Sequence, residues 1–317
     1  MMLHRFQHIR RVVRPAVLLF CTLLCARAQE IEPVTFCSFN LKNWLTMERF
    51  DGRRTLHAAT KPESEKERVV EFIKDINPGV LGVCEIGTDK DVADLKAHLK
   101  AAGLDYPHSE RAHGGDTTRS LALLSRFPIS ARNSQTDLTY KIGETVFPMQ
   151  RGILDVTVDI TPQYQVRFLG VHLKSKRAVA EADEVLMRRN EAHLLRTRLD
   201  SIFAKDLQAR IICYGDFNEH RNESAISEII GSRASDGYMV DIFLRDVSGL
   251  VWTHFWDAAD VYSRFDYFFV SRALKPQVDA RKCYIYSARD FDKGSDHRPI
   301  VMTLNPPTLI KTSAAQE

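Results

Sequence analysis

Apolar residues recur along this chain in runs of strand length. The alternating run Leu154–Ile160 is separated from Val166–His172 by a turn at Thr161-Pro162, so these two runs are predicted to pair as antiparallel neighbours. The other runs, in chain order, are Val34–Asn40, Val80–Glu85, Leu121–Ser125, Arg210–Tyr214, Tyr267–Val270, Lys282–Tyr286 and Arg298–Leu304.

Helical periodicity marks three further segments. Val69–Ile76 follows the capping-box signature Ser64-Glu-Lys-Glu67 and ends at Asn77-Pro78-Gly79. The others are Val92–Leu99 and Val179–Ala204, and the latter is predicted to carry its many arginines on its outer face. Helices that alternate with both crossover and hairpin connections predict an α/β domain of mixed sheets with helices packed outside. No repeat or linker-like tract appears, so one domain is expected.

The first 28 residues have the layout of a secretory signal peptide. A basic start between Arg5 and Arg14 precedes the apolar run Ala16–Leu24, and Ala26-Arg27-Ala28 offers a cleavage site. The apolar run is shorter than the roughly 20 residues that a membrane-spanning helix needs. Arg10-Arg11 leaves a twin-arginine signal open as an alternative. We expect cleavage after Ala28, export to the periplasm or the medium, and a mature domain of residues 29–317.

Removal of this leader leaves a nearly neutral protein. The leader holds five of the 44 Lys and Arg residues and none of the 41 Asp and Glu residues, so the mature chain has a net charge of −2. Proteins that bind nucleic acid mainly through its phosphates usually carry a basic excess, and none is visible here. The mature cysteines, Cys37, Cys84, Cys213 and Cys283, fit no zinc spacing. The first three lie in apolar runs, which favours buried free thiols over disulfides.

Polar residues end or interrupt most of the predicted strands: Asn40, Glu85, His172, Asp216, Asn218, Asp266, Asp296 and His297. Carboxylate and amide oxygens suit a hard cation such as Mg²⁺, and a histidine beside a carboxylate can accept a proton or hold a phosphoryl group. Each residue alone has an ordinary explanation, such as a turn cap or an ion pair of Asp266 with Arg264. Together, buried without partners, they would cost about 2–7 kcal/mol each. A shared metal site accounts for all of them.

Five motifs in this order resemble those of the endonuclease/exonuclease/phosphatase superfamily: Ser38-Phe-Asn40, Cys84-Glu85, Gly215-Asp216-Phe-Asn218, Arg264-Phe-Asp266-Tyr and Gly294-Ser-Asp296-His297. That superfamily includes DNase I, apurinic endonucleases, inositol polyphosphate phosphatases and bacterial sphingomyelinases. The resemblance extends over about residues 34–304. It implies an α/β fold of DNase I type: a four-layered α-β-β-α sandwich of two mixed sheets, with the active site at one edge.

The resemblance also implies roles for individual residues. Glu85 and Asn40 would be the main metal-site residues for Mg²⁺ or Mn²⁺, with Asp296 a further candidate. Asp216 would orient or deprotonate the attacking water, and Asn218 would hold a phosphate oxygen. His297, oriented by Asp266, would be the general base or a phosphate-binding histidine.

Two further residues are assigned by the resemblance. His172 matches a second histidine of the DNase-like and sphingomyelinase-like branches. The glutamate that orients it in DNase I is missing, because Arg119 leads into Ser120–Ser125 here and Glu110 lies elsewhere. The orienting partner of His172 therefore stays open. Arg151 falls where several branches place a phosphate-contacting arginine.

Two clusters near these motifs have two interpretations each. The first cluster follows His172 and consists of Lys174, Lys176 and Arg177. It either contacts an anionic substrate or forms a solvated loop, and in the first case we assign the substrate contact to Lys174. The second cluster is aromatic and precedes Asp266: Trp252, Phe255, Trp256 and Tyr262. These residues either contact the substrate, by stacking on a base or packing on a lipid or sugar, or they anchor their own loop.

The function expected from these observations is that of an exported, divalent-metal-dependent phosphoesterase, specifically a phosphodiesterase of nuclease type. A phosphatase, or a phosphodiesterase acting on phospholipids or small molecules, is the alternative, and the neutral charge favours it. A non-catalytic binding module would have lost at least one of Glu85, Asp216, Asp266 and His297. A zinc hydrolase would show closely spaced histidine ligands. The expected partner is a phosphate-ester substrate; no stable protein partner is implied, and we expect a monomer.

Overall fold

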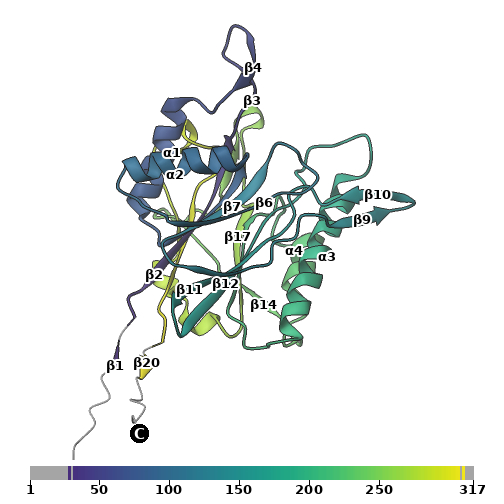
Figure 1. The fold of residues 1–317 in the computed structure, drawn as a ribbon. Helices are drawn as coiled ribbons and strands as arrows, with labels where there is room; N and C mark the ends of the chain where they lie inside the picture. Colours follow the sequence, from purple (N-terminus) through teal and green to yellow (C-terminus); the bar gives the residue numbers. More distant parts are fainter. Residues whose placement is uncertain (1–27, 30, 308, 311–317) are drawn as a thin grey trace, which may run out of the picture. The chain divides into compact units, whose positions relative to one another are not determined.

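The computed structural model describes residues 28–29, 31–307 and 309–310 (Figure 1). The predicted leader, except for Ala28, lies outside the described residues. Ala28–Gln29 (β1) and Leu309–Ile310 (β20) pair antiparallel in a two-stranded ladder, and residues 31–307 form a separate compact unit. Within the described part of the chain, we find no helix with the length and apolar character to cross a membrane.

Two six-stranded mixed sheets form the core of residues 31–307. In the first sheet the order is β18–β19–β2–β5–β7–β6, and β2 and β5 run parallel while the other neighbours are antiparallel. Its strands are Tyr284–Ile285 (β18), Ile300–Leu304 (β19), Val34–Trp44 (β2), Val80–Ile86 (β5), Ser120–Ser125 (β7) and His108–Ala112 (β6).

The second sheet has the order β14–β17–β13–β12–β11–β8, and here β12 and β13 are the parallel pair. The predicted antiparallel pairing of the runs on either side of Thr161 is confirmed, with Leu154 opposite Gly170. The strands are Met239–Asp241 (β14), Asp266–Ser271 (β17), Ile211–Asp216 (β13), Tyr164–His172 (β12), Leu154–Thr161 (β11) and Ile129–Arg132 (β8).

Three hydrophobic clusters hold the two sheets and four helices together in four layers. One cluster lies between the sheets. A second joins the outer face of the first sheet to α1 (Glu63–Ile76) and α2 (Asp89–Ala101). The third joins the second sheet to α3 (Glu184–Phe203) and α4 (Ser224–Ile230). The predicted α-β-β-α sandwich is confirmed.

Aromatic rings fill the centre of the space between the sheets. The ring of Phe36 lies 4.9 Å from Phe168, 4.8 Å from Tyr214 and 5.3 Å from Phe268, measured between ring centroids. Gly82 faces Tyr214 from the opposite sheet, and a Cβ added there would lie 2.1 Å from the ring. The missing side chain of Gly82 therefore lets the two sheets approach over the tyrosine.

Two helix starts differ from the prediction. Helix α1 begins at Glu63 with Pro62 as its N-cap, so Ser64 lies inside the first turn and does not cap the helix. Proline is tolerated there because it lacks only an N–H that the first turn leaves unpaired. Helix α3 begins at Glu184, five residues later than predicted, because the Asp183 carboxylate accepts the N–H groups of Val185 and Leu186.

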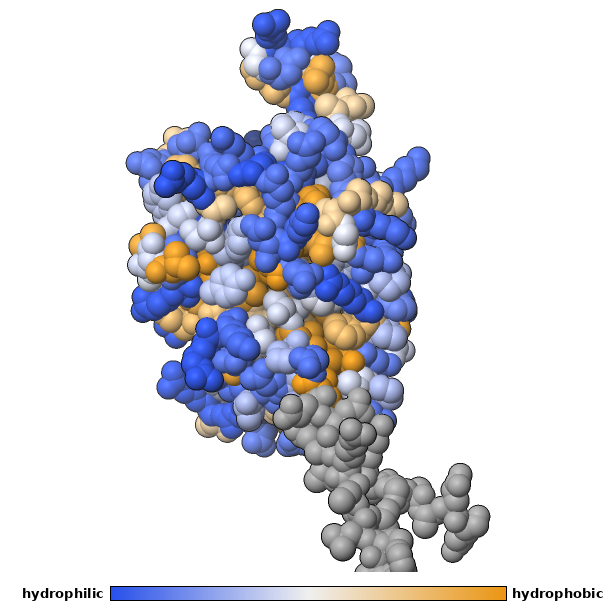
Figure 2. Space-filling view, turned by 90° about the vertical axis from the view of Figure 1, so that its left-hand side faces the viewer, coloured by the Kyte–Doolittle hydropathy of each residue, from blue (hydrophilic) through white to orange (hydrophobic). Residues whose placement is uncertain are grey.

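Three hairpins of short strands were not predicted from the sequence: β3 (Met47–Phe50) with β4 (Thr55–Ala59), β9 (Thr139–Ile142) with β10 (Thr145–Pro148), and β15 (His254–Trp256) with β16 (Val261–Ser263). The first projects at the top of Figures 1 and 2, and its surface is mostly hydrophilic. The four cysteines among the described residues are free thiols, and Cys37, Cys84 and Cys213 are buried, as predicted.

Candidate active site

The ends of three neighbouring strands place three predicted site residues side by side. In the parallel pair β12–β13, His172 lies opposite Asp216. In the antiparallel pair β13–β17, Asp216 lies opposite Asp266. All three side chains are at most 3% exposed. The site is therefore built into the sheet register, and a shift of any of these strands would separate the three residues.

Gly215 lets the backbone of β13 approach β12 just before Asp216. Its φ of +131° and its position, at which a Cβ would lie 1.9 Å from the carbonyl oxygen of Val171, both require glycine. Beyond the strand, the Asp216 carboxylate accepts the N–H of Asn218, whose φ is +49°. The Asn218 amide donates to the carbonyl of Leu173 at 3.1 Å. The Gly-Asp-x-Asn motif thus forms a tight turn across two strand ends.

The first sheet contributes Asn40 and Glu85 from its parallel pair β2–β5. The Asn40 amide donates to Glu85 at 3.3 Å and, across the gap between the sheets, to Asp216 at 3.1 Å. The N–H of Asn43 donates to the second Glu85 oxygen at 3.1 Å. Glu85 has a left-handed φ of +59°, an uncommon conformation that tends to occur at functional sites. This turn directs the carboxylate out of the strand and towards Asp216.

His297 completes the cluster from the segment before β19. Its Nδ1 donates to Asp266 at 2.8 Å, and its Nε2 lies 3.6 Å from Asp216. The Ser295 hydroxyl donates to the Asn40 carbonyl and accepts the N–H of His297, which joins this segment to β2. Asp266 does not pair with Arg264, because Arg264 forms its ion pair with Asp241. The predicted orientation of His297 by Asp266 is thus present in the geometry.

Burial and mutual charge shift the pKa values of these groups. Burial raises the pKa of Asp216 to about 7, although the charge of His297 works in the opposite direction. Burial alone would lower the pKa of His297, but the carboxylates of Asp266 and Asp216 raise that pKa to about 10. His297 is therefore an imidazolium near neutral pH, while Asp216 exchanges its proton in that range.

His172 has a different environment. Its Nε2 lies 3.5 Å from Asp216 and 4.0 Å from Glu85, and its buried Nδ1 has no hydrogen-bond partner among the described residues. Burial and then the nearby charge of Arg151 lower its pKa well below the ordinary value. His172 is therefore a neutral imidazole. Asp216 is the nearer of these two carboxylates, and among the described residues no hydrogen bond orients the His172 ring.

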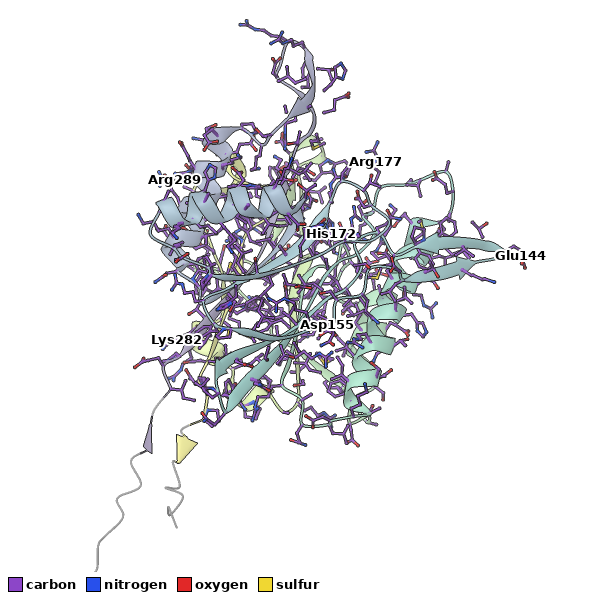
Figure 3. All side chains as sticks on the ribbon, viewed as in Figure 1. Glu144, Asp155, His172, Arg177, Lys282 and Arg289 are labelled. Carbon is purple, nitrogen blue, oxygen red and sulfur yellow. The ribbon has the colours of Figure 1, made fainter. Side chains whose placement is uncertain are left out.

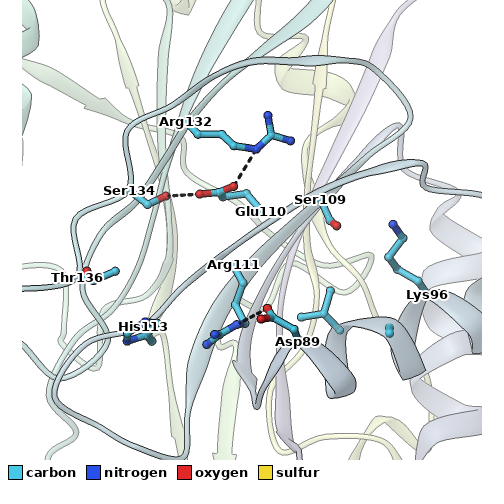
Figure 4. Close-up of a pocket in the computed structure, with 11 residues that line it drawn as sticks. Asp89, Lys96, Ser109, Glu110, Arg111, His113, Arg132, Ser134 and Thr136 are labelled. Atoms are coloured by element: carbon cyan, nitrogen blue, oxygen red, sulfur yellow. Dashed lines mark hydrogen bonds and ion pairs between the residues drawn. The ribbon is translucent and has the colours of Figure 1, made fainter.

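Glu110 is not a partner of His172. It lies on β6, where it binds Arg132 at 3.0 Å and the Ser134 hydroxyl at 3.2 Å in a pocket of about 600 Å³ (Figure 4). That pocket lies between the edge strands β6 and β8 and contains none of the predicted site residues. Its lining mixes charges of both signs, such as Arg111 with Asp89 at 2.7 Å.

Arg151 and Arg119 border the cluster and share an acidic partner. Arg151 is 8% exposed and lies 3.1 Å from Asp116, while its buried Nε has no hydrogen-bond partner among the described residues. Arg119 donates to the Asn43 side chain at 2.8 Å and lies 4.0 Å from Glu85. From the sequence, Arg119 is only the residue found in place of a glutamate. In the structure it supports the loop whose N–H binds Glu85.

The three cations after His172 have separate surroundings. The ammonium group of Lys174 donates to the carbonyl oxygens of Ser175 and Arg177 in a largely buried position. Lys176 pairs with Glu219. The side chain of Arg177 is exposed and forms no hydrogen bond or ion pair with any residue that the structure describes. A substrate contact by Lys174 stays a prediction, and Arg177 is the cation free to make one.

His254 is a site residue that the sequence analysis missed. It forms an isolated β-bridge with His297, and the two rings lie 4.6 Å apart. Its Nδ1 is buried without a partner among the described residues, and burial lowers its pKa to about 4. The aromatic run around it was noted without this residue, because a histidine among aromatics carries no spacing signal.

The aromatic residues beside His254 divide into two groups. Trp252 packs under the guanidinium of Arg298 at 4.1 Å and against Tyr262 at 4.8 Å, and so anchors its loop. Phe255 stacks on Tyr262 at 4.5 Å. Trp256 and Tyr262 are more than half exposed at the edge that carries His297. These two side chains are available to a flat or apolar part of a substrate.

Several of these side chains can hold a metal ion. Ligand atoms of Asp216, Asp266 and His297 lie within 4.8 Å of one another in a buried group. Asp296, a predicted ligand, is half-buried, and its backbone carbonyl accepts the N–H of Phe255. No hydrogen bond joins it to Asn40 or Glu85 within the described residues. Its role as a ligand stays a prediction.

A model of the endonuclease/exonuclease/phosphatase family matches residues 50–297. The chain belongs to this family. Its match covers four of the five motifs, and the fifth, Ser38-Phe-Asn40, lies just before it and meets the others in space. Enzymes of the family hydrolyse phosphoester bonds, and the buried carboxylate and histidine cluster is consistent with that chemistry.

Solved structures of other proteins share the fold. The catalytic domain of human Nocturnin, with a bound sulfate anion, is 16% identical and has a TM-score of 0.60, with 87% of this chain and 96% of that chain covered. Truncated TDP2 from Caenorhabditis elegans is 20% identical and has a TM-score of 0.57, with 86% of this chain and 98% of that chain covered. A family protein from Bacteroides thetaiotaomicron is 17% identical and has a TM-score of 0.59, with 88% of this chain and 96% of that chain covered. No curated protein sequence matches the chain.

Proposed function

We propose that this family member is an exported phosphodiesterase of nuclease type that depends on Mg²⁺ or Mn²⁺. The observation that carries the proposal is the contact of His297 with both Asp266 and Asp216, at 2.8 and 3.6 Å, beside a neutral His172. This arrangement combines a proton acceptor with a fixed cation in a buried cluster. Hydrolysis of a phosphate ester needs both.

Asp216 is the candidate proton acceptor for the attacking water. Its pKa of about 7 places its carboxylate near the optimum for general base catalysis at neutral pH. One Asp216 oxygen is fixed by the N–H of Asn218, and the other faces Asn40 and the two histidines. A water at that second oxygen would lie between the two sheets, beside the place of a bound phosphate.

The imidazolium of His297 and the guanidinium of Arg151 would hold the phosphate. Both are largely buried, so their charges act in a medium of low dielectric constant, where they stabilise the developing charge on the phosphoryl oxygens. The Nε2 of neutral His172 can donate one hydrogen bond to the same group. The interpretation of His297 as a phosphate-binding cation is therefore favoured over that of a general base.

Glu85 and Asn40 fit a hard divalent cation. The Glu85 carboxylate is partly exposed and faces a cluster in which Asp216 and Asp266 add negative charge. The Asn40 NH2 group donates to Glu85 at 3.3 Å, so the Asn40 amide oxygen would have to turn from the N–H of Lys42, at 3.1 Å, to bind the cation. Asp266 and His297 already satisfy each other, which makes them weaker candidates. When bound at Glu85 and Asn40, Mg²⁺ would polarise a phosphoryl oxygen and stabilise the leaving oxygen.

Hydrolysis assays with Mg²⁺ on plasmid DNA, RNA, bis-p-nitrophenyl phosphate and sphingomyelin test this proposal. Activity on bis-p-nitrophenyl phosphate is expected, and cleavage of DNA or RNA would support the nuclease type. Activity confined to sphingomyelin would favour the alternative function of a lipid phosphodiesterase. The exposed aromatic side chains of Trp256 and Tyr262 support that alternative. Glu85→Gln should abolish hydrolysis and weaken Mg²⁺ binding in calorimetry. Unchanged Mg²⁺ affinity in a folded variant would place the cation elsewhere.

Export rests on the predicted leader. N-terminal sequencing of protein recovered from the native envelope or medium is expected to begin at Gln29. Protein that retains residues 1–28 there would contradict the proposed cleavage.

A further inference from the structure

A cavity of about 560 Å³ adjoins the catalytic edge. It lies between the β9–β10 hairpin, the segment after β12 and the first turn of α3. Arg151 and Lys174 form the wall nearest to His172, and Phe147, Val179 and Met187 form an apolar part of the lining. Arg151 lines the cavity and its charge acts on His172, so the cavity adjoins the catalytic residues on the side of Arg151.

A buried glutamate fixes the two walls of this cavity relative to each other. The carboxylate of Glu191, on α3, accepts the N–H of Gln150 at 2.9 Å and the N–H of Lys174 at 2.7 Å. Glu191 is fully buried. Its two hydrogen bonds tie the segment of Arg151 to the segment that follows His172. The cavity therefore has fixed walls on the side of the catalytic residues.

Three cations line the cavity, Arg151, Lys174 and Arg177, with one acid, Glu181, and Arg151 is already paired with Asp116 at 3.1 Å. The buried Nε of Arg151 lacks a partner, and the exposed guanidinium of Arg177 is unpaired among the described residues, while Lys174 is held by backbone carbonyls. Figure 3 labels His172 and Arg177, the two ends of the segment that borders the cavity. Glu181 is an exposed acid on the rim, and the charge of Glu191 is engaged by two N–H groups.

We propose that this cavity is a second anion subsite, which binds a phosphate group of the substrate that lies a short spacer away from the scissile phosphate. Arg151 lies between the two phosphates, Arg177 binds the second one, and the spacer packs on Phe147 and Met187. The inference rests on the proposed function, because it assumes that the scissile phosphate binds beside His172. It adds that the preferred substrate carries two phosphates close together.

Calorimetry with two small ligands tests the subsite at one fixed Mg²⁺ concentration and pH. Propyl phosphate carries one phosphate, and the bisphosphate of propanediol carries a second at the other end of the same three-carbon chain. The bisphosphate is expected to bind the wild-type protein at least about tenfold more tightly, the factor that one charge-assisted hydrogen bond contributes. Arg177→Gln should remove most of this ratio of dissociation constants. Arg189→Gln, an exposed change on α3 outside the cavity, should keep it.

Equal affinities of the two ligands for the wild-type protein would overturn the proposal, as would a ratio that Arg177→Gln leaves intact. Failure of both ligands to bind would also contradict it. The proposed function is judged separately by hydrolysis of bis-p-nitrophenyl phosphate. If the enzyme hydrolyses bis-p-nitrophenyl phosphate but binds the two ligands equally well, the proposed function is supported and the proposed subsite is wrong.

Discussion

At the scale of single residues, the site depends on how three carboxylates share one imidazole. Asp266 binds Nδ1 of His297, Asp216 faces Nε2, and Asp296 adds its charge. The sequence could predict the pairing with Asp266 from the motifs. It could not predict the protonation states, because these depend on burial and on charges that meet across strands, such as those of Asp266 and Asp216 beside His297. Nor could it show His254, which reaches the site through a backbone bridge to His297.

The pH dependence of hydrolysis follows from these states. Asp216 must lose a proton to accept one, so kcat/KM should rise with pH through about 7. His297 must keep its proton, so kcat/KM should fall as pH approaches about 10. Asp266→Asn removes the carboxylate that supports the imidazolium and should move the alkaline limb to lower pH. The measurement is kcat/KM from pH 5 to about 10.5 for both proteins, since such profiles report the groups of the free enzyme. An alkaline limb in the same place in both would show that it does not belong to His297.

The two histidines should contribute unequally. His297→Ala is expected to lower kcat by about 10²–10⁴-fold, the range for a residue that acts on charge or protons in the transition state. His172→Ala should cost less, because a neutral imidazole with an unpartnered Nδ1 is a poor proton donor. The assay compares kcat on a diester with a good leaving group and on one with a poor leaving group. If His172→Ala is harmful only with the poor leaving group, and as harmful as His297→Ala, then His172 is the general acid.

At the scale of secondary-structure elements, strand ends were the reliable signal and helix faces were not. The residues that close each apolar run do meet at one edge, because β2–β5 and β12–β13 are parallel pairs in sheets that pack face to face. On α3, by contrast, Arg188 is fully buried against Glu219, although the arginines were expected on the outer face. The spacing of apolar residues along a helix cannot reveal a buried ion pair, because the acidic partner of the arginine comes from a distant segment of the chain. That pair holds the segment after His172 through the carbonyl of Lys174.

Because β13 closely approaches β12 at Gly215, adding one methyl group there is predicted to lower both stability and activity. In Gly215→Ala the new Cβ would lie 1.9 Å from the Val171 carbonyl oxygen, so the two strands must move apart just before His172 and Asp216. We expect the free energy of unfolding to fall by about 1–3 kcal/mol and kcat to fall as well, although no catalytic side chain changes. Urea unfolding and hydrolysis rates on the same samples measure both.

Gly103→Ala is the matched control. Gly103 has a positive φ of +89°, and a Cβ there would meet no atom within 4 Å. Alanine is disfavoured at a positive φ, so this variant should be less stable than the wild-type protein. Its kcat should be unchanged. If Gly215→Ala retained full activity, the strand register would not be what positions Asp216.

At the scale of the whole molecule, the order of five motifs was enough to predict the four-layered fold through the family resemblance, and each motif lies in or beside a strand of the two sheets. The short hairpins were not predicted, since strands of three to five residues with mixed polarity give no clear period. One of them, β9–β10, borders the second cavity through Phe147, and another, β15–β16, carries the exposed Trp256. The parts proposed to contact a substrate are thus those with the weakest sequence signal.

The charge of the whole molecule limits how it can bind nucleic acid. Without the leader, 39 Lys and Arg residues stand against 41 Asp and Glu residues, and near the active site Arg151 and Arg177 are the two cations that we propose to contact phosphates. Two contacted phosphates predict a slope of about −2 for log kcat/KM on duplex DNA against log salt concentration. The test is plasmid cleavage at fixed Mg²⁺ over a series of NaCl concentrations, at substrate levels below KM. Arg177→Gln should make the slope shallower by about one. A wild-type slope of about −6 or steeper would contradict this, because it would require an extended basic surface that a nearly neutral chain has to assemble from other arginines and lysines.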